Sequence, residues 1–474
     1  MASMQRAILR LLLVAVFALL SSCRAFSPDG ASYAPWARLI LYMHTESGDP
    51  PDISFTISEM SVQDTAGVWH KVAGGPFDIN SLKLASTKQV LLTEDLVRPG
   101  SYKALKLAID KAWMEGRAGR VSLALPQPDK EVVVKAGFDL VDKDSFLVSL
   151  LWRPEDSVEQ GYRFQPFIQA EAQELSARGL LLFISNSGSD YISIIDRGIE
   201  RVIAAVTVGD RPLGMALNGT EDLLYVVAAG ARSIAVVDAA QFRVRSRIPL
   251  PAGAGPTDVV FMPDTHEIEG ELYVINSLSN DVTVVSTLSR RMIKTIPVGN
   301  GPSAILGDRG RREVYVANAL SNSLTIISSF DNSVAATVPV GIRPGGIADG
   351  GDRLYVINEG SNDISMVSKS LRKVIGAIPM VDRPKRALRG FDGRLFVLSS
   401  KSNSVTFINS QNVATRTVPA GRGPAWAAAD EKRNRLYITG AMSDTVSVLD
   451  PIGERFIKEL YVGKGPYGAV ILDR

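Results

Sequence analysis

The residues that most often carry catalytic or metal chemistry are few in this chain. Its 474 residues include three histidines and a single cysteine. His44 and His70 lie early in the sequence, and His266 lies far along it. One cysteine cannot form an intrachain disulfide, and it also excludes the paired-cysteine motifs of zinc, redox and haem-attachment sites. We therefore predict no catalytic residue, no metal site and no cofactor.

The one cysteine, Cys23, stands where a lipid could be attached. Arg6 and Arg10 precede an apolar run over residues 11–20. Such a run is too short to span a bilayer, which needs about 20 residues, but it suits the core of a signal peptide. The run ends in Leu20-Ser21-Ser22-Cys23, which resembles the lipobox of bacterial lipoproteins, where the cysteine thiol carries the lipid. The alternative is an ordinary signal peptide beside an incidental cysteine.

The lipobox resemblance implies a lipid-anchored protein of the cell envelope. It divides the N-terminus into a signal peptide over residues 1–22 and a tether over residues 23–36, with Cys23 as the attachment point. Two or more acyl chains anchor a protein stably, whereas one chain binds reversibly. Residue 24 is arginine and not the aspartate that often retains such proteins in the inner membrane. We therefore expect the outer membrane, with the protein periplasmic or surface-exposed.

The second half of the chain is repetitive. From about residue 180, an apolar-aromatic pair recurs at spacings of 42, 48, 42, 40, 41 and 41 residues. The pairs are Leu182-Phe183, Leu224-Tyr225, Leu272-Tyr273, Val314-Tyr315, Leu354-Tyr355, Leu395-Phe396 and Leu436-Tyr437. Apolar residues within each unit alternate with period two, as in strands. Four short strands in 40 to 45 residues are typical of a propeller blade, so residues 180–474 are predicted to form a seven-bladed β-propeller.

A ring of blades must close. The chain ends in an apolar stretch, residues 467–473, which matches the last strand of the other units. No further first strand follows it in the sequence. We therefore predict that this stretch pairs with residues 180–186 and completes the first blade, which would hide two sheet edges.

The repeat resembles a known family. Leu-Tyr-Val-x-Asn, then Ser-Asn-x-Val-x-Val-Ile, then Ile-Pro-Val-Gly-x-x-Pro, is similar to the YVTN β-propeller repeat. The units at residues 273–276, 315–318 and 355–358 match best, whereas Ala228 and Gly440 replace the asparagine in two others. The family includes surface and cell-envelope proteins. The resemblance implies that the aromatic residues fill space between blades and that each asparagine satisfies turn backbone.

The region before the repeats reads as a separate β-sandwich. Residues 37–170 contain seven segments with strand-like patterns, and residues 171–179 form a polar linker. The segments are 38–43, 53–62, 102–109, 121–125, 132–138, 146–151 and 164–168. Their order, with Val68-Trp69 and Pro99-Gly100 between them, resembles a lipoprotein domain, domain-of-unknown-function family 4382. The fold class is thus all-β, an N-terminal sandwich followed by a seven-bladed propeller.

Composition excludes some partners. Hydrophobic residues make up 46% of the chain and charged residues 22%, with a net charge of +2. Nucleic-acid binders concentrate a basic excess, so we expect no nucleic acid. The innermost strands of the propeller are mostly small and apolar, and Asp258 is their only acid, which argues against a metal-dependent hydrolase in the channel.

One rim of the propeller gathers cations. The loops that lead into the innermost strands carry Arg211, Arg343, Arg383, Arg422 and Lys464. Asp210 and Asp382 partly offset them, and Lys385 and Arg386 follow nearby. Guanidinium groups match carboxylate and phosphate geometry, so this rim is a candidate site for an anionic ligand or acidic partner. The alternative is a solvated rim that only favours solubility.

These observations favour a binding or scaffold lipoprotein. It would be membrane-anchored through its lipid and would present the propeller face to a protein, a polysaccharide or an anionic ligand. One alternative is an envelope enzyme, a hydrolase or oxidoreductase, with a site at the channel mouth. The other is a structural surface-layer or adhesion component. Fold alone does not decide among them.

Overall fold

The computed structural model describes residues 36–474 except 118, 128, 161, 177–178, 252–253, 265–268, 391 and 474. The predicted signal peptide, Cys23 and all but the last residue of the tether lie outside the described residues, and so does His266. In the described part, no helix has the length and apolar character needed to cross a membrane. The described residues from Trp36 onward form one compact unit.

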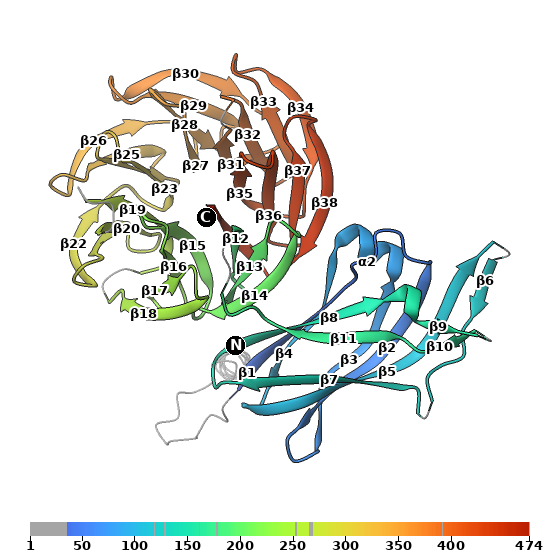
Figure 1. Cartoon of the computed structure of the whole chain (residues 1–474). Coiled ribbons are helices and arrows are strands. Elements are labelled where there is room, and N and C mark those ends of the chain that lie inside the picture. Colours follow the sequence, from blue (N-terminus) through green and yellow to red (C-terminus); the bar gives the residue numbers. More distant parts are fainter. Residues whose placement is uncertain are drawn as a thin grey trace, which may run out of the picture. The chain divides into compact units, whose positions relative to one another are not determined.

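The N-terminal region is a sandwich of two sheets (Figure 1). One sheet has the order β11-β8-β1-β4. Its strands are β1 (Ala37–His44), β4 (Gln89–Val97), β8 (Ser145–Arg153) and β11 (Phe167–Ala172). The other sheet has the order β3-β2-β5-β6, with β7 also paired to β5. Its strands are β2 (Ile53–Asp64), β3 (Trp69–Asn80), β5 (Gly100–Gly116), β6 (Gly119–Ser122) and β7 (Glu131–Leu140).

Apolar side chains that alternate along the strands form the core of the sandwich. Leu39 and Leu41 of β1 are fully buried with Phe55 of β2 and Leu105 of β5. Trp152 of β8 packs edge-on against Phe55, with ring centroids 4.9 Å apart. Because side chains alternate across a strand, one face of each sheet supplies this core.

Two strands of the sandwich were absent from the sequence prediction. β3 contains Gly74-Gly75-Pro76, which breaks the strand pattern, and β4 ends with the charged pair Glu94-Asp95 before Leu96. The one α-helix among the described residues, α2 (Ser81–Thr87), begins where the Asn80 side chain accepts a hydrogen bond from the Lys83 N–H. Short elements also connect β8 to β11, namely η1 (Pro154–Asp156), β9 (Val158–Glu159) and β10 (Arg163–Phe164).

The rest of the chain is a ring of seven four-stranded sheets, as predicted (Figure 1). Blade 1 contains β12 (Leu180–Asn186), β13 (Tyr191–Asp196), β14 (Arg201–Thr207) and β39 (Pro466–Asp473). Blades 2 and 3 contain β15 (Pro212–Leu217), β16 (Leu223–Ala228), β17 (Ser233–Asp238), β18 (Arg243–Pro249), β19 (Pro256–Pro263), β20 (Gly270–Asn276), β21 (Asp281–Ser286) and β22 (Arg291–Pro297). Blades 4 and 5 contain β23 (Pro302–Asp308), β24 (Glu313–Asn318), β25 (Ser323–Ser328), β26 (Ser333–Pro339), β27 (Pro344–Asp349), β28 (Arg353–Asn358), β29 (Asp363–Ser368) and β30 (Lys373–Pro379). Blades 6 and 7 contain β31 (Pro384–Arg389), β32 (Leu395–Ser399), β33 (Ser404–Ile408), β34 (Ala414–Pro419), β35 (Pro424–Asp430), β36 (Arg435–Gly440), β37 (Thr445–Asp450) and β38 (Arg455–Tyr461).

The innermost strand of every blade begins with proline. These strands, β15, β19, β23, β27, β31, β35 and β39, surround the central axis and contact one another (Figure 1). Proline has no N–H to donate, so it is tolerated at the first residue of a strand. The shared Pro therefore fixes where each innermost strand starts.

The aromatic and asparagine residues of the repeat have mostly the predicted roles. Tyr225 packs with Phe261 of the next blade, with ring centroids 6.0 Å apart, so aromatics do fill space between blades. Asn318 donates to the backbone oxygen of Ser323. In blades 3 and 5 the asparagine donates to side chains of the next strand instead of to backbone, since Asn276 bonds Asp281 and Thr283.

Closure follows the prediction. β39, the last strand of the chain, pairs antiparallel with β12, from Leu180 opposite Asp473 to Asn186 opposite Pro466. Blade 1 therefore contains strands from both ends of the repeat region, and its sheet order is β14-β13-β12-β39 (Figure 1).

The sandwich sheet and the propeller share buried contacts. Ile40 and Tyr42 of β1 point away from the sandwich core and pack in a cluster with Tyr191 and Tyr437. The Gln89 side chain pairs with the backbone of Val202 in β14, accepting at 2.8 Å and donating at 3.2 Å. These contacts cover part of the outer edge of blade 1, which would otherwise expose unpaired backbone groups.

Candidate functional site

The five rim cations predicted from the sequence lie on equivalent loops. Each loop connects the outermost strand of one blade to the innermost strand of the next, and it ends at the proline described above. The loops between blades lie on one face of the propeller. The loops that join the second and third strands within each blade lie on the same face. Arg211, Arg343 and Arg383 directly precede the proline, whereas Arg422 and Lys464 precede it by two residues.

The residue before the proline has a left-handed backbone in every blade. Gly255, Gly301, Gly423 and Gly465 occupy this position in four blades, with φ between 61° and 68°. Arg211, Arg343 and Arg383 occupy it in the other three, with φ of 53°, 53° and 51°. The position therefore has the same conformation whether it is glycine or arginine.

A side chain of the neighbouring turn holds this conformation in place. The backbone N–H of Arg343 donates to the Asn322 side chain at 2.9 Å, and that of Arg383 donates to Asn362 at 3.1 Å. The N–H of Arg211 makes the same contact with Asp190 at 3.4 Å. The N–H groups of Gly301, Gly423 and Gly465 donate in the same way to the side chains of Asn280, Asn403 and Asp444. The loop geometry is thus built by the repeat and does not depend on the arginine side chain.

An arginine at this position carries a local energetic cost. A residue with a Cβ in the left-handed region is less stable than glycine by about 1 kcal/mol. Such strain is concentrated at functional positions in proteins, and the inference runs from the observed outlier to a hypothesis of function. Left-handed residues with a Cβ also occur at other turns of the propeller, such as Glu200, Arg290 and Arg312. The rim therefore differs from those turns in gathering exposed arginines on equivalent loops of one face, and not in its backbone strain.

The rim arginines are exposed. Arg211, Arg343, Arg383 and Arg422 all reach solvent, and no ion pair to any of the four side chains occurs in the part of the chain that the structure describes. Asp210 and Asp382 are also exposed on the same loops. Lys464 differs, because its ammonium lies 3.1 Å from Glu94 of β4, whose side chain is only 3% exposed. Glu94 also accepts hydrogen bonds from Ser189 and Tyr191 at 2.9 Å, so Lys464 is engaged within the molecule.

A second polar group lies deeper, in the central channel. Arg386 of β31 in blade 6 reaches Asp258 of β19 in blade 3, with 3.7 Å between Nη1 and Oδ2. Its guanidinium stacks on Trp426 at 4.1 Å from the ring centroid. It also donates to the Tyr467 hydroxyl at 3.0 Å. Four blades thus contribute to one cluster, which we call the channel cluster: Asp258, Arg386, Trp426 and Tyr467.

Burial shifts two ionisable groups at this cluster. Burial raises the pKa of Asp258 from 3.8 to about 6, although the charge of Arg386 offsets part of the rise. Burial, and then the charge of Arg386, lower the pKa of Lys385. The sequence pointed to Asp258 and Arg386 separately, but Trp426 and Tyr467 were missed. Their signal was available, since no other innermost strand has an aromatic residue at the first or second position after its proline.

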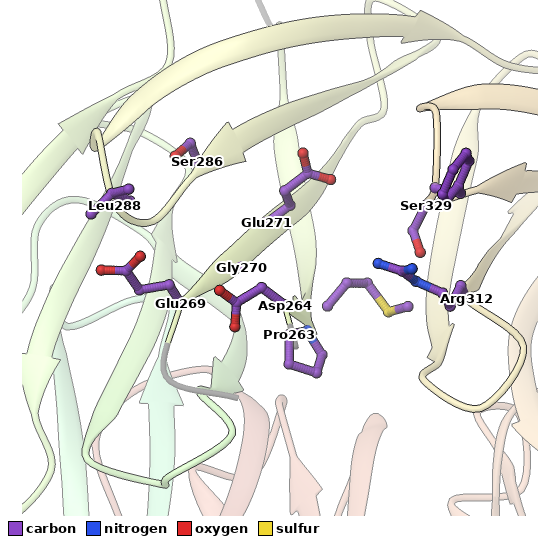
Figure 2. A pocket seen from close by; sticks show the side chains of 11 residues that line it. Pro263, Asp264, Glu269, Gly270, Glu271, Ser286, Leu288, Arg312 and Ser329 are labelled. Atoms are coloured by element: carbon purple, nitrogen blue, oxygen red, sulfur yellow. The ribbon is translucent and has the colours of Figure 1, made fainter. Parts of the chain in front are cut away.

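A hollow of about 330 Å³ lies on the opposite face, between blades 3 and 4. Figure 2 shows the Arg312 guanidinium pointing into it from one side, with Glu271 and Asp264 on the other. The Glu271 carboxylate already accepts from Tyr273 at 2.7 Å and from Asn332 at 3.1 Å. Asp264 and Glu269 line the hollow, and residues 265–268, which come between them in the sequence, are outside the described part.

The histidines within the described residues are separate from one another. His44 is buried, lies 2.8 Å from the Ser149 hydroxyl, and has its pKa lowered to about 3 by burial. His70 contacts Asp64 at 2.8 Å. Within the described ranges, no three metal-ligating side chains of the His, Cys, Asp and Glu types come together.

Fold and repeat together define a seven-bladed β-propeller protein that also carries an N-terminal β-sandwich. A curated relative is the seven-bladed beta-propeller protein Rv1057 of Mycobacterium tuberculosis (strain ATCC 25618 / H37Rv), 29% identical over 133 residues. The match covers 27% of this chain and 32% of the relative, so the chain spans about a third of that protein's length. No protein-family model matches the chain.

Solved structures agree on the fold. A functionally unknown protein from Desulfotomaculum acetoxidans DSM 771 superposes with a TM-score of 0.55 at 15% identity, covering 62% of this chain and 99% of the other. Virginiamycin B lyase from Staphylococcus aureus is also similar, with a TM-score of 0.48 at 14% identity over 56% of this chain and 90% of the enzyme. Likeness at these identities extends to the fold and not to the activity.

Proposed function

We propose that this protein is a lipid-anchored binding or scaffold module of the cell envelope that captures an acidic partner on the rim formed by Arg211, Arg343, Arg383 and Arg422. A propeller is a rigid platform with a broad face, which suits such a role. The observation that supports the rim is its four exposed arginines on equivalent loops, none of which has an ion pair among the described residues.

The rim chemistry favours an acidic protein surface. Exposed guanidinium groups pair with carboxylates in a two-pronged geometry. On a rigid ring they present several contacts at once, and weak contacts add when they form together. Lys464 is assigned a smaller part, because Glu94 already neutralises it.

The anchor is supported by the sequence alone. Leu20-Ser21-Ser22-Cys23 follows an apolar run of signal-peptide length. A lipid at Cys23 would keep the protein at the membrane, and the outer membrane is the proposed location. The sandwich would then separate the rim from the lipid surface.

Affinity purification from native membranes tests the proposal. The lipidated protein is cross-linked in membranes, purified and analysed by mass spectrometry, beside a triple variant with Arg211→Glu, Arg343→Glu and Arg383→Glu. The matched control changes the same charge on the opposite face with Arg290→Glu, Arg309→Glu and Arg311→Glu, all exposed. We expect a stoichiometric partner with wild type and control that is lost from the rim variant. A partner retained by all three proteins would refute the rim, and an acidic polysaccharide in place of a protein would correct the partner class.

A further inference from the structure

The innermost strands differ sharply in what they place two residues after the shared proline. Four blades have no side chain beyond a methyl group there, and three have large or charged ones. The seven residues are Gly214, Asp258, Ala304, Gly346, Arg386, Trp426 and Gly468. A Cβ added to Gly214 would lie 2.3 Å from the Asp258 carboxylate. The absence of a side chain at Gly214 therefore leaves room for the Asp258 carboxylate. The large side chains therefore come from blades 3, 6 and 7 and reach over positions where the other blades have glycine or alanine.

The guanidinium of Arg386 is incompletely bonded. Its side chain is 12% exposed, and its only hydrogen bond among the described residues goes to Tyr467. The 3.7 Å to Asp258 is an ionic contact and too long for a hydrogen bond. No Arg386 nitrogen is both buried and without a partner, so its remaining donors are open to solvent and available to an acceptor that enters the channel.

Asp258 is incompletely bonded as well. Its Oδ2 atom and the neighbouring Thr257 hydroxyl are buried with no hydrogen-bond partner among the described residues. Asp258 itself is 1% exposed. Arg386 is the one cation of the channel cluster, and with Asp258 protonated the cluster carries a net charge of +1. The cluster thus has both unfilled hydrogen-bonding groups and a charge that favours one negative charge.

An apolar cavity adjoins the guanidinium. It measures about 150 Å³ and is lined by Arg386 and Trp426 together with aliphatic residues. These are chiefly Ile305, Leu306, Ile347, Leu388 and Leu398. A cavity of roughly 150 Å³ with apolar walls accommodates a benzene ring. Size and lining therefore fit one ring-sized apolar group next to a cation.

We propose that the channel cluster binds a small carboxylate that carries a ring-sized apolar group. The ring occupies the cavity, and the carboxylate accepts hydrogen bonds from Arg386. Trp426 holds the guanidinium plane by stacking, and Tyr467 fixes its orientation. This site is separate from the rim, because its residues lie inside the channel and none of them belongs to the rim loops.

Titration calorimetry of the mature full-length protein tests the site with four defined probes. Benzoate carries both charge and ring, benzamide the ring without charge, acetate the charge without ring, and benzylamine the opposite charge. We expect benzoate to bind. Benzamide and acetate should bind at least tenfold more weakly than benzoate, and benzylamine should not bind at all. No benzoate binding up to millimolar concentrations, or equal binding of benzamide, would overturn the proposal.

Two variants separate the site from the rim and from misfolding. Ala427→Leu fills the cavity without altering any charge, and it should abolish benzoate binding. Arg386→Gln removes the guanidinium that would donate hydrogen bonds to the carboxylate, and it should also abolish benzoate binding. The rim triple variant should bind benzoate like wild type. Because Ala427→Leu leaves the ion pair intact, undiminished benzoate binding in that variant, confirmed as folded by circular dichroism, would refute the site even if Arg386→Gln fails to fold.

Discussion

Arg197 of blade 1 and Asp430 of blade 7 form an ion pair in which neither side chain is exposed to solvent. Arg197 also pairs with Asp473, the last residue of β39, and donates to the backbone oxygen of Leu472 at 3.1 Å. One guanidinium therefore joins the first blade, the last blade and the closing strand. This contact complements the backbone pairing of β12 with β39.

Removing Arg197 should weaken closure of the ring. Arg197→Met leaves Asp430 buried without its partner, and breaking a buried pair from one side costs about 3 to 5 kcal/mol. The free energy of unfolding in urea measures the loss. Arg353→Met is the matched control, because Arg353 pairs with Asp352 while the two side chains are 37% and 78% exposed, and such exposed pairs contribute about 1 kcal/mol or less. Equal losses in the two variants would show that Arg197 has no special part in closure.

The rim arginines should lower stability while supporting binding. Arg211→Gly, Arg343→Gly and Arg383→Gly each relieve a left-handed residue with a Cβ, so each should raise the free energy of unfolding by up to about 1 kcal/mol. The combined variant should lose the membrane partner.

Arg290→Gly is the control for this exchange. Arg290 is also left-handed, with φ of 55°, but it lies between β21 and β22 on the opposite face. The Arg290→Gly variant should show a similar increase in the free energy of unfolding in urea, and it should still bind the membrane partner. If the three rim variants lose stability instead, their side chains contribute to the fold and the strain argument is wrong.

Sequence periodicity predicted most of the propeller because each blade has the same residue types at the same strand positions. Tyr273, Tyr315 and Tyr355 recur at spacings of 42 and 40 residues, so the pattern of one blade predicts that of the others. The closing strand followed from counting, since residues 467–473 had no partner of their own. β3 and β4 were missed because neither repeats and both interrupt their alternation with Gly, Pro or acidic residues.

The channel cluster could not be assembled from sequence alone. Asp258, Arg386, Trp426 and Tyr467 come from four blades, and only the curvature of the ring brings them together. The left-handed arginines were within reach, since aligning the loops puts Arg343 and Gly301 in the same place before the proline. The pairing of Lys464 with Glu94 was not, because Glu94 belongs to the sandwich.

Cys23 should determine where the protein is found. Cys23→Ser removes the thiol that would carry the lipid, so nearly all of the protein should move from the membrane fraction to the soluble periplasmic fraction. Incorporation of labelled palmitate into wild type and not into the variant is the direct measurement. A variant that stays with the membrane and a wild type without label would together exclude the lipoprotein proposal.

Asp258 should make stability depend on pH over a defined window. Its folded pKa is about 6 against an ordinary value of 3.8, so between these values the folded state holds a proton that the unfolded state has released. Stability must therefore fall as pH rises from about 4 to about 6 and level off above it, by roughly 3 kcal/mol at 1.36 kcal/mol per pKa unit. Asp258→Asn removes this contribution. Its stability relative to wild type should therefore increase with pH across the same window, with Asp382→Asn on the exposed rim as the control.

The same carboxylate should tune the channel site. The ionisable group that faces Asp258 is Arg386 across the channel, while the flanking strands place Gly214 and Ala304 at the equivalent positions. A ligand carboxylate near Arg386 repels ionised Asp258, so binding should favour its protonated form. Benzoate affinity should thus increase several-fold from pH 7.5 to pH 5.5 in wild type. In Asp258→Asn it should be high at both values, since the repelling charge is gone. An affinity in wild type that does not change with pH, alongside unchanged affinity in the variant, would show that Asp258 does not face the ligand.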